Sequence, residues 1–304
     1  MKSPYYRFSQ YLKERFHCKV YKINIDAGFS CPNRDGTLSK EGCIFCDNRG
    51  FNVFNRLSTK DIRAQINEGM QFYRKRYQAD KFIIYFQTFT NTYAPLEILE
   101  EKYKIIEEFS DVVGLSIATR PDCINEDILE LIDKFTCKYE VWIEYGLQSV
   151  HNSTLNLINR GHTYEKFLET FDLTRKKSKI KICVHLIVGL PGEDLEMVKY
   201  TFKEMGRIEV DGIKIHPLHV IKDTPLHRLY LEGKYTPLSM QEYVDTVVEV
   251  LQYLAPSTVI QRLTATCSPQ ILVAPMWINK RSEVLRSIES KCRQENKFQS
   301  KLYK

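Results

Sequence analysis

Long hydrophobic runs are absent from this 304-residue sequence. No stretch approaches the ~20 consecutive apolar residues that a helix needs to cross a bilayer. The first sixteen residues, MKSPYYRFSQYLKERF, have neither an apolar core nor a small-residue cleavage site, so we expect no secretory signal. No low-complexity linker interrupts the chain, and a composition of 43% hydrophobic and 27% charged residues is typical of a folded protein. We therefore expect a soluble, cytoplasmic protein without a membrane partner.

Cysteine, in contrast, is abundant, with nine residues. In a reducing compartment thiols stay free, so the clustered Cys31, Cys43 and Cys46 indicate a metal site or redox chemistry. Cys292 lies in a polar tail and is expected to be exposed. The remaining five are expected to be buried thiols without a chemical role: Cys18, Cys123, Cys137, Cys183 and Cys267.

The net charge of +6 is unevenly distributed. Residues 280–304 hold eight basic and three acidic side chains, and smaller basic clusters lie at 74–76 and 175–177. Basic segments on an otherwise nearly neutral body suit a polyanionic partner, chiefly a nucleic acid. This pattern predicts RNA binding, with a helix over 283–298 along the phosphates. A solvated surface with a frayed tail is the alternative interpretation.

Strand-like and helical segments alternate along most of the chain. The expected strands are 20–26, 81–87, 112–118, 139–147, 180–188 and 212–220. The expected helices are 58–77, 95–109, 125–135, 151–158, 164–177, 194–207, 225–232 and 238–254. Parallel strands need crossover helices, so this order predicts an α/β fold of six βα units, either a doubly wound sheet or a whole or partial barrel. In doubly wound sheets and in barrels alike, the catalytic and ligand-binding residues lie at the carboxyl ends of the strands.

We expect three parts in the chain. Residues 1–19 form an N-terminal extension, residues 20–260 the core domain, and residues 261–304 a basic C-terminal extension. A short strand near 257–262 and a basic helix are expected at this C-terminal boundary and beyond it.

The clustered cysteines follow the first expected strand. Cys43 and Cys46 form a Cys-x2-Cys pair, and Gly36 and Gly42 allow the loop to fold back so that Cys31 joins them. Three thiolates leave one iron of a [4Fe–4S] cluster open, whereas structural zinc uses four closed ligands.

The zinc alternative depends on a fourth ligand, for which Cys18 and His17 are the candidates. A strand that rises ~3.3 Å per residue separates both of them from the cysteine loop. The spacing therefore favours an iron–sulfur cluster and leaves zinc open.

An aromatic residue, Phe45, stands directly before the last clustered cysteine, which resembles the signature of radical S-adenosylmethionine (SAM) enzymes. The eleven residues between the first two cysteines resemble the branch that contains the catalytic subunit of the Elongator complex and its small bacterial relatives. Further segments carry this resemblance in order, most of them near strand ends: 26–36, 86–92, 116–122, 144–149, 159–163, 185–193 and 214–222.

The resemblance implies a partial (β/α)6 barrel of the TIM type, with a [4Fe–4S] cluster on the three clustered cysteines. It also implies that SAM binds the open iron and is cleaved to methionine and a 5′-deoxyadenosyl radical, which takes hydrogen from the substrate. The usual SAM-contacting glycines are absent from 86–92, and Ala118 replaces a carboxylate. The implied SAM-binding residues are Phe45, Gln87, Thr90, Asn91, Ser116, Glu144, Gln148, Arg160 and His185.

Three charged or titratable positions also have a physical interpretation of their own. Glu144 is a carboxylate in an apolar strand, so it is expected to accept hydrogen bonds from SAM or to pair with Arg120 or Arg160. Lys214 and His216 share one face of the sixth strand, with His219 on the other face. If that first face lines the barrel, Lys214 and His216 are the candidate catalytic residues that hold an anionic substrate.

The same resemblance implies a tRNA substrate that is modified at the wobble uridine. No acetyltransferase-sized segment follows the barrel, so we expect maturation of 5-carboxymethylaminomethyluridine toward the aminomethyl or methylaminomethyl form. The expected partners are tRNA, a reductant such as flavodoxin or ferredoxin and, as a functional partner, a methyltransferase. Two alternatives stay open: a radical SAM enzyme that acts on a small molecule or a peptide, and a zinc-stabilised RNA-binding module.

Overall fold

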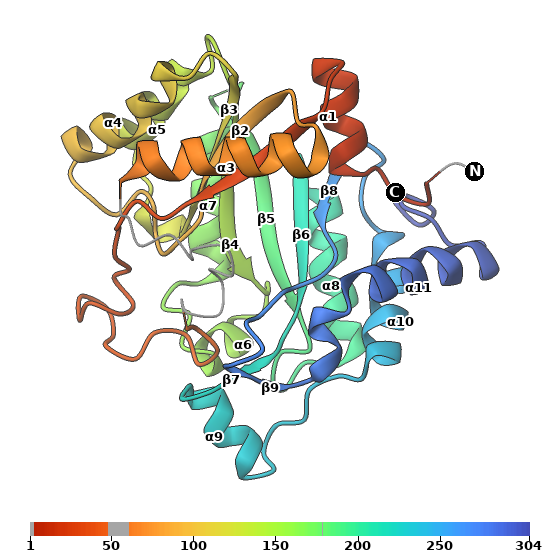
Figure 1. Ribbon diagram of the computed structural model, residues 1–304. Helices are drawn as coiled ribbons and strands as arrows, with labels where there is room; N and C mark the ends of the chain where they lie inside the picture. The colour runs from red at the N-terminus through yellow and green to blue at the C-terminus, as the bar shows by residue number, and fades with distance from the viewer. Residues whose placement is uncertain (1–2, 48–60, 178) are drawn as a thin grey trace.

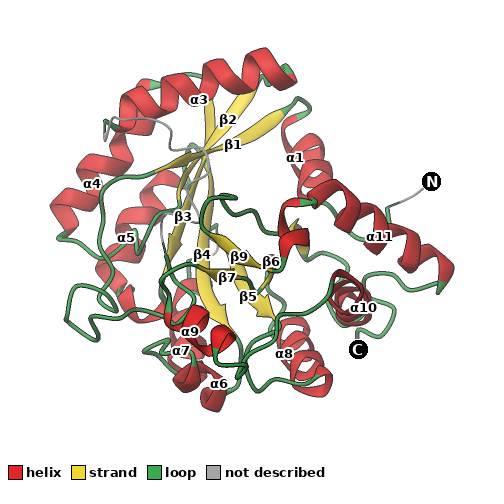
Figure 2. Cartoon of the chain, turned by 60° about the horizontal axis from the view of Figure 1, so that its bottom comes forward, coloured by secondary structure: helices red, strands yellow, loops and turns green. Residues whose placement is uncertain are grey.

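A computed structural model of the chain describes residues 3–47, 61–177 and 179–304. Its central feature is a parallel sheet with the strand order β1-β2-β3-β4-β5-β6-β8. The sheet curls into a partial barrel with helices around its outer face (Figures 1 and 2), which confirms the expected barrel against the flat doubly wound alternative. Its strands are β1 (Val20–Ile25), β2 (Lys81–Phe86), β3 (Val112–Thr119), β4 (Glu140–Gln148), β5 (Lys181–Val188), β6 (Gly212–Pro217) and β8 (Val259–Arg262).

The helices from α3 onward lie close to their expected positions, whereas α1 was not predicted from the sequence. Asn125 caps α5 as predicted, because its side chain accepts the Ile128 N–H. Of the expected helix 58–77, residues 58–60 lie outside the described residues. The helices are α1 (Phe8–Phe16), α3 (Ile62–Tyr77), α4 (Leu96–Lys104), α5 (Glu126–Phe135), α6 (Asn152–Leu157), α7 (Tyr164–Arg175), α8 (Leu195–Arg207), α9 (Pro225–Leu231), α10 (Met240–Leu251) and α11 (Arg281–Gln294). Short 3-10 turns are η1 (Ile105–Glu108), η2 (Pro121–Cys123) and η3 (Met276–Asn279).

Two strand predictions change in the structure. The segment expected near 257–262 does not stand apart but forms β8, which pairs with β6 and adds a seventh strand to the barrel. The strand expected over 212–220 ends at Pro217, because proline has no N–H to donate to a neighbouring strand. Beyond it, β7 (Val220–Ile221) pairs with β9 (Leu272–Ala274) in a separate antiparallel ribbon.

Alternate residues of the barrel strands face opposite sides. One set, which includes Ile84, Ile117 and Ile143, is fully buried and packs with the surrounding helices in the main hydrophobic core. The other set faces the interior of the barrel and includes polar and charged residues. The wall of the barrel is therefore held by its outer layer, while its inner face is free to carry chemistry.

Helix α1 closes the amino-terminal end of the barrel. The rings of Phe8 and Tyr11 pack edge-on against buried Trp142, with centroid distances of 6.1 and 5.7 Å. Trp142 packs with Cys183 and Val259 in the same small apolar cluster. These contacts fill the space between α1 and Trp142, beside a cavity of about 780 Å³ that residues of α1 and of the strands also line.

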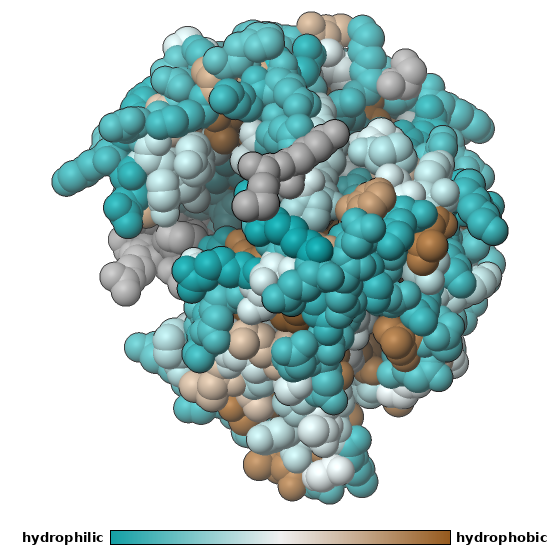
Figure 3. All heavy atoms as spheres, turned by 90° about the vertical axis from the view of Figure 1, so that its right-hand side faces the viewer, coloured by the Kyte–Doolittle hydropathy of each residue, from teal (hydrophilic) through white to brown (hydrophobic). Residues whose placement is uncertain are grey.

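Helix α11 and the chain beyond it also belong to the body of the protein. Val284, Ile288 and Cys292 lie in the main core, so the expectation that Cys292 is exposed was wrong. Gln299 accepts the Tyr6 N–H at 2.8 Å, which ties the last residues to the first ones. The face of the molecule on which α11 lies is largely hydrophilic (Figure 3). Among the described helices, none combines the length and apolarity that crossing a bilayer requires.

Candidate active site

Each of the seven barrel strands places at least one polar side chain on the inner face. The strand register sets their order, since His185 lies opposite Lys214 and Lys214 lies opposite Arg262 on adjacent strands. Tyr85 lies opposite Ser116 in the same way. From β1 to β8, the seven side chains are Lys22, Tyr85, Ser116, Glu144, His185, Lys214 and Arg262.

Glu144 is the centre of this group and is fully buried. Its Oε1 accepts hydrogen bonds from Lys22 Nζ and Ser116 Oγ, both at 2.5 Å. Its Oε2 accepts from His185 Nε2 at 2.7 Å and from Lys214 Nζ. The carboxylate therefore pairs with two lysines and with neither of the arginines expected from the sequence. Four donors fill its usual acceptor positions, which leaves little capacity for a further ligand.

The charges of this group control its protonation. Burial alone would raise the pKa of Glu144, but Lys214 and Lys22 together hold that pKa well below its usual range. Burial, and then the charge of Lys214, lowers the pKa of His185 to about 4, so this imidazole is neutral at pH 7. Burial, with the repulsion of Lys22, outweighs the attraction of Glu144 and lowers the pKa of Lys214 to about 8. At neutral pH Glu144 is therefore ionised, and Lys214 is largely protonated.

Glu144, Cys183 and His185 also place ligand-type atoms within 4.8 Å of one another. Two ammonium groups already contact the carboxylate, so they would repel a metal cation at this position. Burial raises the pKa of the Cys183 thiol, which opposes the thiolate that a metal would need. We therefore interpret this trio as part of the charged network and not as a metal site.

The cysteine loop lies at the carboxyl ends of the strands, where Cys31, Cys43 and Cys46 line one cavity of about 220 Å³. Ile44 fixes the loop from both sides: its N–H donates to the Ile158 carbonyl at 3.1 Å, and its carbonyl accepts the Leu226 N–H at 2.9 Å. The predicted glycine turns are present, since φ is +97° at Gly36 and +73° at Gly42.

The donors around the cysteines fit an iron–sulfur cluster with three protein ligands. Cys43 Sγ accepts from Arg160 Nη1 at 3.5 Å and from Asn33 Nδ2 at 3.6 Å, and N–H donors to sulfur stabilise and tune such clusters. Burial, and then the nearby Cys43, raises the pKa of Cys46 to about 12, so the positive charge of a metal would be needed to ionise this thiol at neutral pH. The buried Oδ1 of Asn33 has no partner among the described residues, which leaves an acceptor at the same site.

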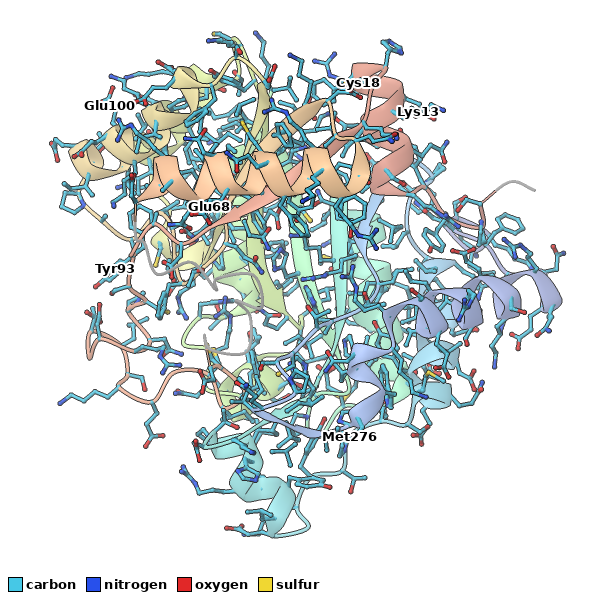
Figure 4. The ribbon with its side chains drawn as sticks, viewed as in Figure 1. Lys13, Cys18, Glu68, Tyr93, Glu100 and Met276 are labelled. Carbon is cyan, nitrogen blue, oxygen red and sulfur yellow. The ribbon has the colours of Figure 1, made fainter. Side chains whose placement is uncertain are left out.

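The fourth ligand that zinc would require is not at hand. Cys18 packs with Leu12 and Val20 near α1. In Figure 4 it lies at the end of the molecule where α1 is found, and His17 lines a different cavity. The described residues therefore give no support to the four-ligand zinc alternative.

Most of the SAM-binding residues expected from the sequence line the cavity of the three cysteines. Two do not: the Asn91 side chain donates to the Ala118 carbonyl at 2.9 Å and supports the loop after β2, and Ser116 lies behind Glu144. The expected residues that do line the cavity are Phe45, Gln87, Thr90, Glu144, Gln148, Arg160 and His185, together with the catalytic candidates Lys214 and His216.

Arg160 is held in place by its surroundings. Its Nε donates to the Gly146 carbonyl at 2.9 Å, and a Cβ at Gly146 would lie 2.6 Å from Arg160 Nη2. Arg120 forms a two-point ion pair with Asp122 and donates to the Arg160 carbonyl at 2.8 Å. Residues 119–122, part of the segment 116–122 that carries the resemblance, therefore support the loop that holds Arg160.

Sequence reasoning missed several residues of the site. Lys22 was counted only as part of an apolar strand, although an isolated lysine between apolar neighbours was a usable signal. Arg262 was missed because its strand was placed outside the barrel. His219, expected on the opposite face from Lys214, also lines the cavity because the chain leaves the strand at Pro217.

Residues 33–205 match the sequence family described as the Radical SAM superfamily, and residues 210–294 match the Radical_SAM C-terminal domain. The chain belongs to the radical SAM superfamily. This membership confirms the resemblance seen in the sequence, and with it a [4Fe–4S] cluster and SAM as the cofactors.

Relatives of this radical SAM protein include YtqA of Bacillus subtilis, which is 38% identical over 299 residues that cover 98% of this chain and 92% of YtqA. The tRNA uridine(34) acetyltransferase of Methanocaldococcus jannaschii is 34% identical over 49% of this chain and 28% of its own length. The structure of Methanocaldococcus infernus Elp3 superposes with a TM-score of 0.67 at 21% identity, over 92% of this chain and 64% of that one. The sequence matches bear out the predicted similarity to the Elongator-type branch, and the structural match shows that the fold is shared. The chain spans well under two thirds of the acetyltransferase, so that protein's whole activity does not transfer to it.

Proposed function

We propose that this radical SAM enzyme acts in the cytoplasm on the modified wobble uridine of tRNA. Its substrate in this proposal is the 5-carboxymethylaminomethyl side chain, which matures toward the aminomethyl or methylaminomethyl form. The observation that carries the proposal is a cationic barrel interior that adjoins the cysteine-lined cavity. A second cavity of about 780 Å³ shares Tyr85, Gln87, Lys214 and Arg262 with the first, so an anionic group there lies next to the place where SAM would bind.

The residues divide into those that hold the cofactors and those that face the substrate. Cys31, Cys43 and Cys46 would hold the cluster, and Arg160 would contact the SAM carboxylate through its guanidinium. Lys214 and His216 would face the substrate, since both line the cysteine cavity from β6. When bound, the cluster and SAM supply a 5′-deoxyadenosyl radical that takes a hydrogen atom from the side chain.

Loss of the carboxymethyl group as a two-carbon aldehyde acid oxidises its methylene carbon by two electrons and consumes one water. The hydrogen atom taken by the radical carries one of those electrons and one proton into 5′-deoxyadenosine. The second electron replaces the one that the reductant supplies, and the second proton is released. A reductant such as flavodoxin or ferredoxin would start the cycle, and a methyltransferase would add the methyl group of the methylaminomethyl form.

Mass spectrometry of tRNA nucleosides from cells with and without the gene tests this proposal. We expect cells without it to accumulate the 5-carboxymethylaminomethyl nucleoside and to lose its aminomethyl products. The matched control is a strain that carries the Cys43→Ala variant, which should resemble the deletion. Unchanged nucleosides, together with intact SAM cleavage by the purified protein, would instead support a small-molecule or peptide substrate.

A further inference from the structure

The interior of the barrel holds more positive than negative charge. Lys22, Lys214 and Arg262 enter it from β1, β6 and β8. Among the described residues that line the cysteine cavity, Glu144 is the only carboxylate. The neighbouring histidines do not offset this excess because burial keeps the pKa of His185 and of His216 low, so both rings are neutral at pH 7.

Arg262 differs from the two lysines in what it contacts. Lys22 is held by Glu144 and by Gln261, whose Oε1 lies 2.8 Å from its Nζ. Lys214 is held by Glu144 and by the Tyr85 hydroxyl at 3.0 Å. The Arg262 guanidinium has no hydrogen bond or ion pair with any residue of 3–47, 61–177 or 179–304. A half-buried cation without a partner favours the binding of an anion.

The position of Arg262 limits which anion it can meet. It lines both cavities, so it lies at their junction, and its register neighbour on β6 is Lys214. Lys214 in turn lies 4.1 Å from the centroid of the Tyr85 ring. The guanidinium fork forms two parallel hydrogen bonds with a carboxylate, and Lys214 adds attraction from the adjacent strand.

We propose that Arg262 binds the carboxylate of the substrate side chain, and that Lys214 and Lys22 strengthen this attraction. This inference rests on the proposed function, because the carboxymethylaminomethyl group supplies that carboxylate. The aminomethyl product lacks it, so the same residue distinguishes substrate from product and favours product release. SAM also carries a carboxylate, but Arg160 already lies beside Cys43 at the cysteine end of the cavity.

The test measures tRNA binding to the reconstituted holoenzyme with SAM and without reductant, so that no turnover occurs. One tRNA carries 5-carboxymethylaminomethyluridine at the wobble position and the other carries 5-aminomethyluridine. We expect the wild-type protein to bind the first about 10-fold more tightly, as a charged hydrogen-bonded pair implies. Arg262→Gln should remove this preference, and Arg262→Lys should keep part of it. Arg286→Gln is the matched control, because Arg286 is exposed on α11.

Three results would overturn the inference. The first is a preference that persists in Arg262→Gln, and the second is an equal loss of affinity for both tRNAs, which would assign Arg262 to a phosphate. The third is a weaker SAM affinity in the variant, which would assign Arg262 to the SAM carboxylate. Iron content and melting temperature show whether each variant is folded. If Arg262→Gln is not folded, the comparison of Arg262→Lys with the wild type decides the case. A separate assay with reductant distinguishes failure of this inference from failure of the proposed function. If the wild-type protein converts the first tRNA but binds both tRNAs equally, only this inference is overturned. If it does not convert the first tRNA, the proposed function is overturned.

Discussion

The two ends of the barrel are built from the same strands and do different work. At the amino-terminal end, Phe8 and Tyr11 of α1 pack on Trp142 and close the barrel with apolar contacts. At the carboxyl-terminal end, the strands lead into loops that leave a cavity lined by the three thiols. Apolar packing fills the space between α1 and the sheet at the first end, whereas the residues that carry the chemistry lie at the second end, as in other barrels of parallel strands. The contrast implies that damage to one end should leave the property of the other largely intact.

Removal of a thiol from each end gives the largest expected difference. Cys43→Ala should abolish SAM cleavage, because a cluster with two remaining thiolates loses a required ligand. Cys18→Ala, at the closed end, should retain both iron and activity. Iron content and release of 5′-deoxyadenosine, measured anaerobically with reductant, check both variants. Loss of the cluster in Cys18→Ala would revive the four-ligand interpretation and break the contrast.

Removal of the buried ring at the closed end should affect stability most. Trp142 is fully buried, so Trp142→Ala should lower the free energy of unfolding by about 3–5 kcal/mol through lost contacts and a new cavity. Denaturant unfolding measures this change. SAM affinity of the folded fraction should stay near that of the wild type, because the ring lies away from the thiols. A large loss of SAM affinity in the folded variant would show that the two ends are coupled.

Acid should lower the free energy of unfolding through His185, which lies between the two ends of the barrel. The unfolded chain binds a proton at His185 with a pKa near 6.5, whereas in the folded protein burial lowers this pKa to about 4. The folded state therefore binds fewer protons between these values, and its stability falls as the pH decreases through that window, by up to about 3 kcal/mol. Denaturant unfolding at pH 7.5, 6 and 5 should show a shallower fall for His185→Asn than for the wild type. Equal slopes would mean that His185 does not control this part of the pH dependence.

The smallest effect is expected on the surface of α11, away from both ends. Arg293 and Glu289 are separated by 3.5 Å in a solvent-exposed pair, so Arg293→Gln should change the free energy of unfolding by less than about 1 kcal/mol. Glu283→Gln, on the same helix, is the matched control, because Glu283 pairs with Lys280 at the surface. Glu289 is less suitable because it also contacts Arg7. Thermal unfolding of both variants measures the change. A loss of several kcal/mol would show that the ion pairs of α11 are structural.

Several basic residues singled out in the sequence prove to be paired. On α11 and beyond it, Lys297 contacts Glu249 at 2.9 Å, and Lys291 contacts Asp245. Arg175 of the basic cluster 175–177 contacts Asp211 at 2.7 Å. Counting charges along the sequence therefore overstates the free charge of the tail, and RNA binding by that tail stays a prediction.

The sequence predicts the barrel and the cysteine loop well because both depend on local patterns. The strand expected at 180–188 is observed at Lys181–Val188, and the turns at Gly36 and Gly42 follow from residue type. The partners of Glu144 could not be predicted, because Lys22 and Lys214 reach it from strands far apart in the chain. The burial of Cys292 was predictable in principle, since Val284, Ile288 and Cys292 recur every four residues, but the surrounding charges concealed this stripe.

The seven polar side chains from Lys22 to Arg262 lie on the strands of the barrel, whereas the cluster ligands lie on a loop. Changes of substrate selectivity and changes of cofactor binding can therefore occur at separate positions. A substitution at one of the seven strand positions alters the shape and charge offered to a substrate while the cysteine loop and its backbone anchors stay as they are. Substrate selectivity can thus be changed by substitutions on individual strands, without altering the loop that binds the cofactors. A library randomised at Lys22, Lys214 and Arg262 alone would explore new substrates on an unchanged radical generator.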